Sequence, residues 1–374
     1  MQIKRDIQGV RALAVLLVIA NHLYPHQIAG GYIGVDIFFA LSGYLITGQL
    51  LQREGISVRR GIRDFYASRI RRILPSALLT ILVTDYFAFS LLGPIEGLRV
   101  NKDGFWSTLF LANNWFNSVK LDYFGNAQAI SLLQHYWSLA VEEQFYIFWP
   151  IVLLSSLLLL RKKRVLVKVL PILILGTSLC YAALEINRGV PTSYLATATR
   201  IWELMAGALL AIWAPNGREI RSLPHLKSAS FITLVGIAFI YTDHTGVPGL
   251  ATIPVILATV VLVTPGHTGR PLSALLENKV SFYIGAISYV LYLWHWPVIA
   301  LWEKYQGSSL HGSQPLLAVV LAFTLSVLTH HLVENPIRFS PYLLGKPYVS
   351  ICGGLTLIAL TIGIIQWVRV AHGV

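Results

Sequence analysis

Charged residues are scarce in this sequence. Of its 374 residues, 12% are charged and 55% are hydrophobic, whereas a soluble domain has roughly 25% charged residues. No long polar insert separates the apolar runs, which argues against a chain of two or three soluble domains. The composition therefore predicts a single domain that lies in a membrane and is surrounded by its lipids.

Cysteine is almost absent as well, and so are the common catalytic motifs. Only Cys180 and Cys352 occur, so no disulfide framework is available. The sequence contains no P-loop, no Gly-x-Ser-x-Gly elbow and no His-Glu-x-x-His motif. Its net charge of +12 would suit nucleic acid, but no zinc-finger spacing or soluble basic module accompanies it. We therefore expect no nucleic-acid partner.

Long apolar windows are abundant, and they predict an all-α integral membrane fold. A spanning helix needs roughly 17 to 25 apolar residues. Several windows are short or broken by Gly and Pro, notably 229–242 and 249–264, so we predict a bundle of about ten to eleven transmembrane helices. The eleven windows are 9–25, 31–51, 74–92, 136–160, 165–185, 196–213, 229–242, 249–264, 281–302, 315–333 and 348–367.

Lysine and arginine are distributed unevenly among the connections, and this asymmetry predicts the orientation. With a cytoplasmic N-terminus, 21 of the 29 basic residues fall in inner segments and six in outer ones, while Arg11 and Arg200 fall within helices. We therefore expect the N-terminus inside and the C-terminus on the far side of the membrane.

Two ionisable residues stand out in the first window, Arg11 and His22. A charged group inside a bilayer costs on the order of 3 kcal/mol or more, so it requires a partner or a function. The two residues are eleven positions apart, which is about 16 Å of rise and almost three turns of an α-helix. They should share one helix face, with Arg11 toward the cytoplasm and His22 near the outer end. We interpret them as a functional pair; a satisfied core histidine is the plainer alternative.

Three more polar side chains, Asp36, Glu142 and His295, are expected at a similar depth in the outer half of the membrane. A carboxylate on one ring nitrogen of a histidine would hold the tautomer that acts as a general base through the other. Alternatively, Asp36 and Glu142 simply neutralise Arg11 or Arg200. The sequence leaves both interpretations open.

Two arginine pairs with helical spacing allow different interpretations. Arg69 and Arg72 stand at i and i+3, on one helix face at the inner membrane surface. Paired guanidiniums suit a phosphate, but positive-inside anchoring explains them equally well. Arg200 and Glu203 have the same spacing, and we interpret them as an internal ion pair.

Two weaker signals concern a metal and a sugar site. His330, His331 and Glu334 resemble metal ligands, but no tetrahedral set is visible, so we predict no metal. The longest outer connection, 93–135, is rich in aromatic residues that could stack on sugar rings. An aromatic belt at the membrane interface is the alternative. These aromatic residues are Phe105, Trp106, Trp115, Phe116, Tyr123 and Phe124.

Five motifs, in order along residues 5–340, resemble those of the acyltransferase 3 family. Together they are far more specific than any single motif. They are RDIQGVRALA at 5–14 with His22, GYIGVDIFFALSGYLI at 31–46, FYASRIRRILP at 65–75, YWSLAVEEQFY at 136–146 and SYVLYLWHWP at 288–297.

The resemblance implies a membrane enzyme that moves an acyl group, usually acetyl, from cytoplasmic acetyl-CoA to a carbohydrate hydroxyl on the far side. By position, His22 corresponds to the family's catalytic histidine and Arg11 to its partner. Arg69 and Arg72 correspond to the pair proposed to hold the CoA phosphates. The remaining candidates are Asp36 and Glu142 for catalysis, Arg11, Ser42 and Tyr44 for donor binding, and Trp137, Tyr146 and His295 for acceptor binding.

The implied mechanism has one main form and two alternatives. We expect the pantetheine arm of CoA to pass Arg11 toward His22, which removes the proton of a sugar hydroxyl. An acyl-enzyme on Ser42, on a tyrosine or on His22 itself is the covalent alternative. A transporter or flippase for a glycolipid or small solute is the rival function, because buried charges and interrupted helices also describe transporters.

The domain organisation follows from the same resemblance. Residues 1–340 correspond to the acyltransferase 3 transmembrane domain, and 341–374 to an extra helix that leads, in some members, to a periplasmic SGNH-hydrolase-like domain. We expect the chain to be the membrane part of a bacterial inner-membrane O-antigen acetyltransferase, separated from such a domain. Its acceptor would be a polysaccharide or a lipid-linked glycan. A naturally short form is the alternative.

Overall fold

A computed structural model describes residues 5–53, 57–119, 131–159, 164–190, 194–214 and 224–372. Within these ranges the chain forms helices and turns and no strand, so the protein has the all-α fold that its apolar windows predict. All eleven predicted windows are helical. They correspond to α1 (Arg5–Leu23), α2 (Ile33–Leu51), α3 (Val58–Leu92), α6 (Tyr136–Leu159), α7 (Arg164–Asn187), α8 (Thr197–Trp213), α9 (Pro224–Ile240), α10 (Ile253–Val263), α12 (Lys279–Gln306), α13 (Gln314–Thr329) and α16 (Pro347–Ala371).

Not every one of these helices is long enough to cross a bilayer. Among the described residues, eight helical segments have the length and apolar composition of a membrane span, which makes this a multi-pass membrane protein. The two helices at 224–240 and 250–263 are apolar but shorter, and α8 has 17 residues. The predicted number of ten to eleven transmembrane helices therefore stays a prediction.

The predicted outer connection at 93–135 is in part helical. It contains α4 (Pro94–Thr108) and α5 (Ala112–Ser118). The rings of Trp106 and Trp115 stack on each other with centroids 5.8 Å apart, and the amino group of Lys102 lies 4.5 Å from the Trp115 ring centre. Trp106 and Trp115 thus stack on one another within this segment. Tyr123 and Phe124 lie outside the described residues.

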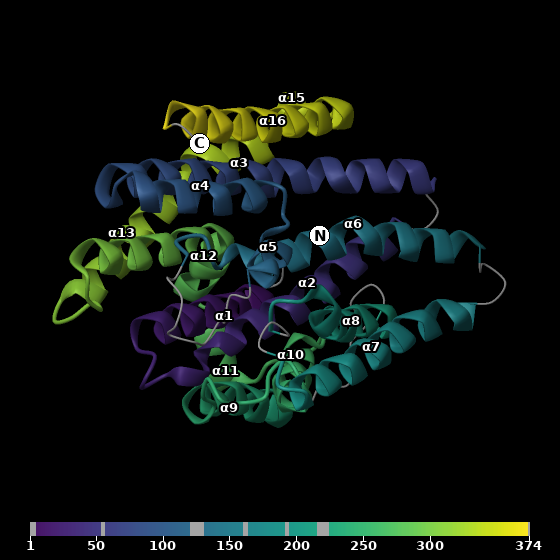
Figure 1. The fold of residues 1–374 in the computed structure, drawn as a ribbon. Coiled ribbons are helices and arrows are strands. Elements are labelled where there is room, and N and C mark those ends of the chain that lie inside the picture. Colours follow the sequence, from purple (N-terminus) through teal and green to yellow (C-terminus); the bar gives the residue numbers. More distant parts are fainter. Residues whose placement is uncertain are drawn as a thin grey trace. The chain divides into compact units, whose positions relative to one another are not determined.

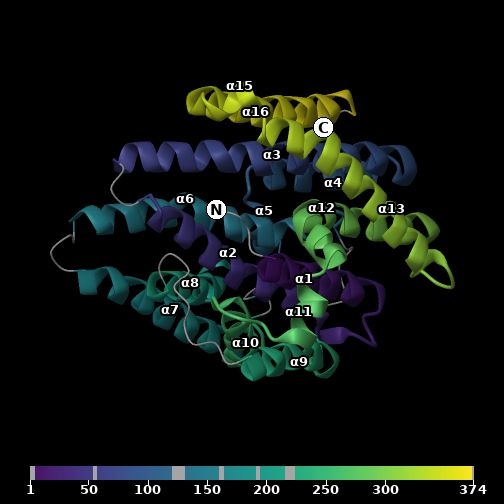
Figure 2. The same cartoon turned by 180° about the vertical axis from the view of Figure 1, so that it is seen from behind.

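Shorter elements join the long helices. They are the 3-10 helices η1 (Ala29–Tyr32) and η4 (Leu250–Thr252), α11 (Arg270–Leu276), the π-helix η5 (His330–Glu334), α14 (Asn335–Arg338) and α15 (Pro341–Leu344). Figure 1 and, from behind, Figure 2 label the long helices together with α11 and α15. The chain divides into two compact units. Among the described residues, the first unit contains those up to Val58 and those within Val141–Ser288, and the second contains Arg59–Val119, Ser131–Ala140 and Tyr289–His372.

The first unit is built on a close contact between α2 and α8. A Cβ atom added at Gly43 of α2 would lie 1.8 Å from the backbone oxygen of Leu204, and one added at Gly207 of α8 would lie 1.8 Å from that of Ala40. Small residues allow helix backbones to approach one another, which is how helices commonly associate within membranes. Both Asp36 and Ser42 are on α2, so this contact fixes two of the predicted site residues.

We expect Gly43→Ala to lower the free energy of unfolding by about 1–3 kcal/mol, because the added methyl group overpacks the contact with α8. Gly48→Ala is the matched control, since a Cβ at Gly48 on the same helix meets nothing within 4 Å. That variant should be unchanged or more stable by up to about 1 kcal/mol. Thermal unfolding of the purified variants measures both, and equal stabilities would contradict the close packing.

In the second unit, α16 runs alongside α3 and α4, as both views show (Figures 1 and 2). Nη1 of Arg71 in α3 donates to Oγ of Ser350 at 2.9 Å and to the backbone oxygen of Leu343 at 3.3 Å. Nδ2 of Asn101 in α4 donates to the backbone oxygen of Ile365 at 3.2 Å. Polar contacts therefore tie α16 to the helix that carries Arg69 and Arg72.

Candidate active site

The helix α1 carries both members of the predicted pair. Arg11 is buried, with 7% of its surface exposed, and its Nη1 donates to Oε1 of Gln8 at 3.3 Å. His22 lies in the last turn of α1 and is partly exposed. Its neighbour Asn21 donates from Nδ2 to the backbone oxygen of Ala29 at 2.8 Å, which fixes the turn that leads to α2. The structure thus places a buried guanidinium and an accessible imidazole on one continuous helix.

Three of the predicted residues meet at one carboxyl group. Oγ of Ser42 in α2 donates to Oε1 of Glu142 in α6 at 2.8 Å, and the hydroxyl of Tyr146 donates to Oε2 at 3.2 Å. Glu142 is therefore an oriented acceptor between α2 and α6. Tyr44, also on α2, is buried, with 5% of its surface exposed.

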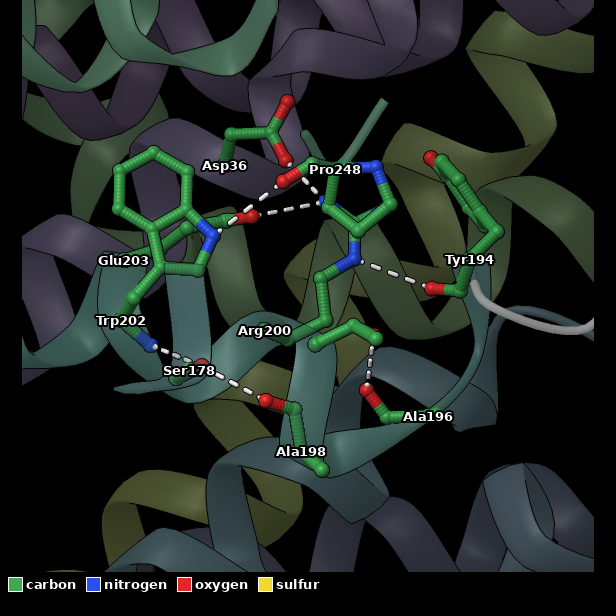
Figure 3. Close-up of polar contacts among 10 residues, drawn as sticks. Asp36, Ser178, Tyr194, Ala196, Ala198, Arg200, Trp202, Glu203 and Pro248 are labelled. Atoms are coloured by element: carbon green, nitrogen blue, oxygen red, sulfur yellow. Dashed lines mark hydrogen bonds and ion pairs between the residues drawn. The ribbon is translucent and has the colours of Figure 1, made fainter. Parts of the chain in front are cut away.

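Asp36 lies in a different polar cluster, which Figure 3 shows. Nη1 of Arg200 lies 2.6 Å from Oδ1 of Asp36 and 2.9 Å from Oε1 of Glu203. All three side chains are at most 1% exposed. Nε of Arg200 donates to the backbone oxygen of Tyr194 at 3.0 Å, and the guanidinium lies over the ring of that residue at 4.2 Å. Asp36 thus neutralises Arg200, which is the alternative that the sequence left open, and the predicted Arg200–Glu203 ion pair is confirmed.

Neighbouring contacts fix the start of α8, where Arg200 lies. Oγ of Ser178 in α7 donates to the backbone oxygen of Ala198 at 2.6 Å and accepts from the backbone nitrogen of Trp202 at 3.1 Å. Nε1 of Trp202 donates to the backbone oxygen of Pro248 at 3.3 Å (Figure 3). These bonds hold the first turn of α8 against α7, so the guanidinium of Arg200 is presented to α2 in a fixed position.

The second unit holds the predicted phosphate-binding arginines on α3. Arg69 is buried, and its guanidinium lies 5.5 Å from the centre of the Phe65 ring. Arg72 is partly exposed and interacts electrostatically with Glu334 and Arg338. The two arginines share α3 but face different neighbours.

The predicted acceptor-binding residues are all buried. Trp137 is 0% exposed, His295 1% and Tyr146 5%. Nδ1 of His295 lies 2.7 Å from the backbone oxygen of Tyr292, whose hydroxyl is 2.7 Å from Oγ of Ser138. Trp137 and His295 therefore belong to the packed interior of the second unit, and acceptor binding by these three residues stays a prediction.

The structure adds residues to the site that the sequence alone did not single out. His135 packs its ring against His295 with centroids 5.8 Å apart. His135 directly precedes the predicted span 136–160, and a histidine at the edge of a span is the signal by which the sequence could have singled it out. Arg338 lies in α14, after the π-helix, and interacts electrostatically with Arg72; the sequence gives no sign of the π-helical turn.

Comparison with known proteins places most of the chain in one family. The profile of an acyltransferase domain matches residues 4–331. This range contains all of the predicted site residues, including His22, Glu142 and His295. It ends within the π-helix that follows α13.

Curated relatives resemble the chain over most of its length. A Bacillus subtilis protein named "Putative peptidoglycan O-acetyltransferase YrhL" is 35% identical over 353 residues, which cover 89% of this chain and 54% of that protein. The peptidoglycan O-acetyltransferase OatA of Listeria monocytogenes is 33% identical over 352 residues, covering 89% of this chain and 55% of OatA. The chain thus spans about half the length of these relatives. No solved structure matches it.

Proposed function

Because the chain belongs to the acyltransferase 3 family, we propose that it is the membrane part of an O-acyltransferase that modifies a carbohydrate outside the cytoplasm. The observation that carries the proposal is α1, which holds a buried Arg11 and a partly exposed His22 within a multi-pass membrane protein. An ionisable pair in a spanning helix marks a functional site by default.

His22 is the general base of the proposed reaction. Its ring nitrogen takes the proton of a sugar hydroxyl as the hydroxyl oxygen attacks the thioester carbonyl. The carbon–oxygen bond forms, the carbon–sulfur bond breaks, and the CoA thiolate leaves and takes up a proton. Glu142 is held by Ser42 and Tyr146 at 2.8 and 3.2 Å, which suits a carboxylate that orients a reacting group.

The proposed donor is acetyl-CoA from the cytoplasm. Arg69 and Arg72 supply guanidiniums of the kind that bind phosphate. The charge asymmetry of 21 basic residues against six supports a cytoplasmic N-terminus and a periplasmic C-terminus in a bacterial inner membrane. We assign residues 1–340 to the transferase domain and 341–374 to a helix that leads to a periplasmic SGNH domain.

The proposed acceptor is a cell-surface polysaccharide. Two of the relatives are named for peptidoglycan, whereas the motifs alone led to a polysaccharide or a lipid-linked glycan, such as O-antigen, as the predicted acceptor. Both offer sugar hydroxyls, so the chemistry at His22 is the same. NMR of peptidoglycan and of O-antigen from cells with and without the protein would show which of the two gains O-acetyl groups.

Reconstitution tests the proposal against a transporter. We expect liposomes that contain the purified chain, acetyl-CoA inside and polysaccharide outside, to release CoA inside and to acetylate the polysaccharide outside. Empty liposomes are the control. Solute flux or lipid movement without release of CoA would support a transporter or flippase and would contradict the proposed function.

A further inference from the structure

The π-helix His330–Glu334 at the end of α13 places a buried carboxyl group among basic side chains. Glu334 is 2% exposed. Its Oε2 lies 2.7 Å from Nδ1 of His330, and its Oε1 accepts from Nη1 of Arg338 at 3.2 Å. Both carboxylate oxygens are therefore engaged, and they fix the orientation of the two basic groups. Turns of this kind occur frequently at functional sites.

Arg72 of α3 adds a second guanidinium to this cluster. Its charge acts on both Glu334 and Arg338, and it forms no hydrogen bond with any residue in the described part of the chain. Arg72 and Arg338 repel one another, and the single carboxylate of Glu334 offsets only one of the two positive charges. The cluster thus has an excess of positive charge that an anion would neutralise.

The two arginines that carry this excess positive charge are accessible to solvent. The side chain of Arg338 is 25% exposed, and that of Arg72 is partly exposed. Guanidiniums bind phosphate oxygens through paired N–H groups. Since Glu334 occupies one nitrogen of Arg338, the guanidinium keeps further N–H groups for an anion.

We propose that Arg338 and Arg72, with Arg338 oriented by Glu334, bind a phosphoryl group of the acyl-CoA donor. The proposal rests on the proposed acyl transfer from CoA and adds Arg338 to the donor site, with Glu334 as a positioning residue. Anchoring at the membrane surface would explain a basic residue here. It does not explain why the buried carboxylate of Glu334 holds Arg338 in one orientation while the charge of Arg72 acts on both.

A lipid headgroup also contains a phosphoryl group, so the experiment must distinguish binding of CoA from binding of lipid. The purified chain is placed in nanodiscs of a zwitterionic lipid, and the Kd values of CoA and of pantetheine, which lacks phosphate, are measured by calorimetry. We expect Arg338→Gln to raise the Kd of CoA by about tenfold or more and to leave that of pantetheine unchanged. Arg338→Lys, which keeps the charge but loses the paired geometry, should give a smaller rise.

The control is Arg188→Gln, which removes an exposed arginine that follows α7 and pairs with Glu185 at the end of that helix, and it should leave both Kd values unchanged. Thermal unfolding of each sample checks the fold, and Arg338→Lys supplies the comparison if Arg338→Gln does not fold.

Wild-type affinity for CoA in Arg338→Gln would overturn the inference and leave the proposed function standing. An effect that appears only when anionic lipid is added would assign the cluster to a headgroup and overturn it too. Failure of the wild type to bind CoA would overturn both the inference and the proposed function.

Discussion

Replacing His22 by alanine is expected to lower acyl transfer by at least about 100-fold, because a positioned general base contributes roughly 10²–10⁴-fold to such a reaction. The side chain is partly exposed at the end of α1, so its loss should leave the fold intact. The measurement is the O-acetyl content of cell-surface polysaccharide by NMR, together with CoA release in the liposomes. The amount of protein in the membrane should equal that of the wild type.

His26→Ala is the matched control for this variant. His26 lies four residues further on, in the exposed turn after α1, and its replacement should leave transfer unchanged. If His22→Ala keeps more than half of the wild-type transfer, His22 is not the base and the proposed mechanism fails. A radiolabelled acyl group trapped on the wild type without acceptor, but not on His22→Ala, would point to the covalent route through this residue.

The second large effect is expected at Arg200. Arg200→Met should destabilise the protein by about 3–5 kcal/mol, because it leaves the carboxyl groups of Asp36 and Glu203 buried without their cation. Nη1 of Arg200 lies 2.6 Å from Oδ1 of Asp36 and 2.9 Å from Oε1 of Glu203, so both carboxyl groups lose a direct contact with the cation. Thermal and denaturant unfolding of the purified variant in detergent would measure the loss.

A neutral version of the cluster separates charge from packing. Asp36→Asn and Glu203→Gln, added to Arg200→Met, should recover a large part of the stability, because no uncompensated charge then remains buried. Arg188→Met, which removes a 68%-exposed arginine paired with Glu185 at 3.0 Å, should cost less than about 1 kcal/mol. A triple variant that is no more stable than Arg200→Met would show that the cluster stabilises the protein through packing rather than through charge.

Local patterns predict most of the helices, since each apolar window depends only on neighbouring residues. The windows found α1, α2 and α12 to within a few residues, and the i,i+3 spacing found the Arg200–Glu203 pair. The start of α3 was missed because charged residues interrupt its first 16 positions, with Arg59, Arg60 and Arg63 among them. A hydropathy window averages the polar and apolar faces of a helix, so it does not detect such an amphipathic extension.

Contacts between distant segments could not be predicted in this way. Asp36 and Arg200 are 164 residues apart in sequence, and depth counting alone placed Asp36 equally well beside His22. Ser42 and Glu142 are 100 residues apart, and only the packing of α2 with α6 joins them. The π-helix at His330 depends on a single altered turn, for which hydrophobic periodicity carries no signal.

The helix α16 lies beyond residues 4–331, which match the family, yet Arg71 of α3 binds Ser350 at its start. Arg71 stands between Arg69 and Arg72, so a movement of α16 along its axis would pull on the helix segment that presents both of them. The periplasmic domain that we propose at the far end of α16 would thus act mechanically on Arg69 and Arg72, the proposed donor-binding arginines. A version cut after α14 would lose the hydrogen bonds of Arg71 to Leu343 and Ser350, and with them this coupling between α3 and α16.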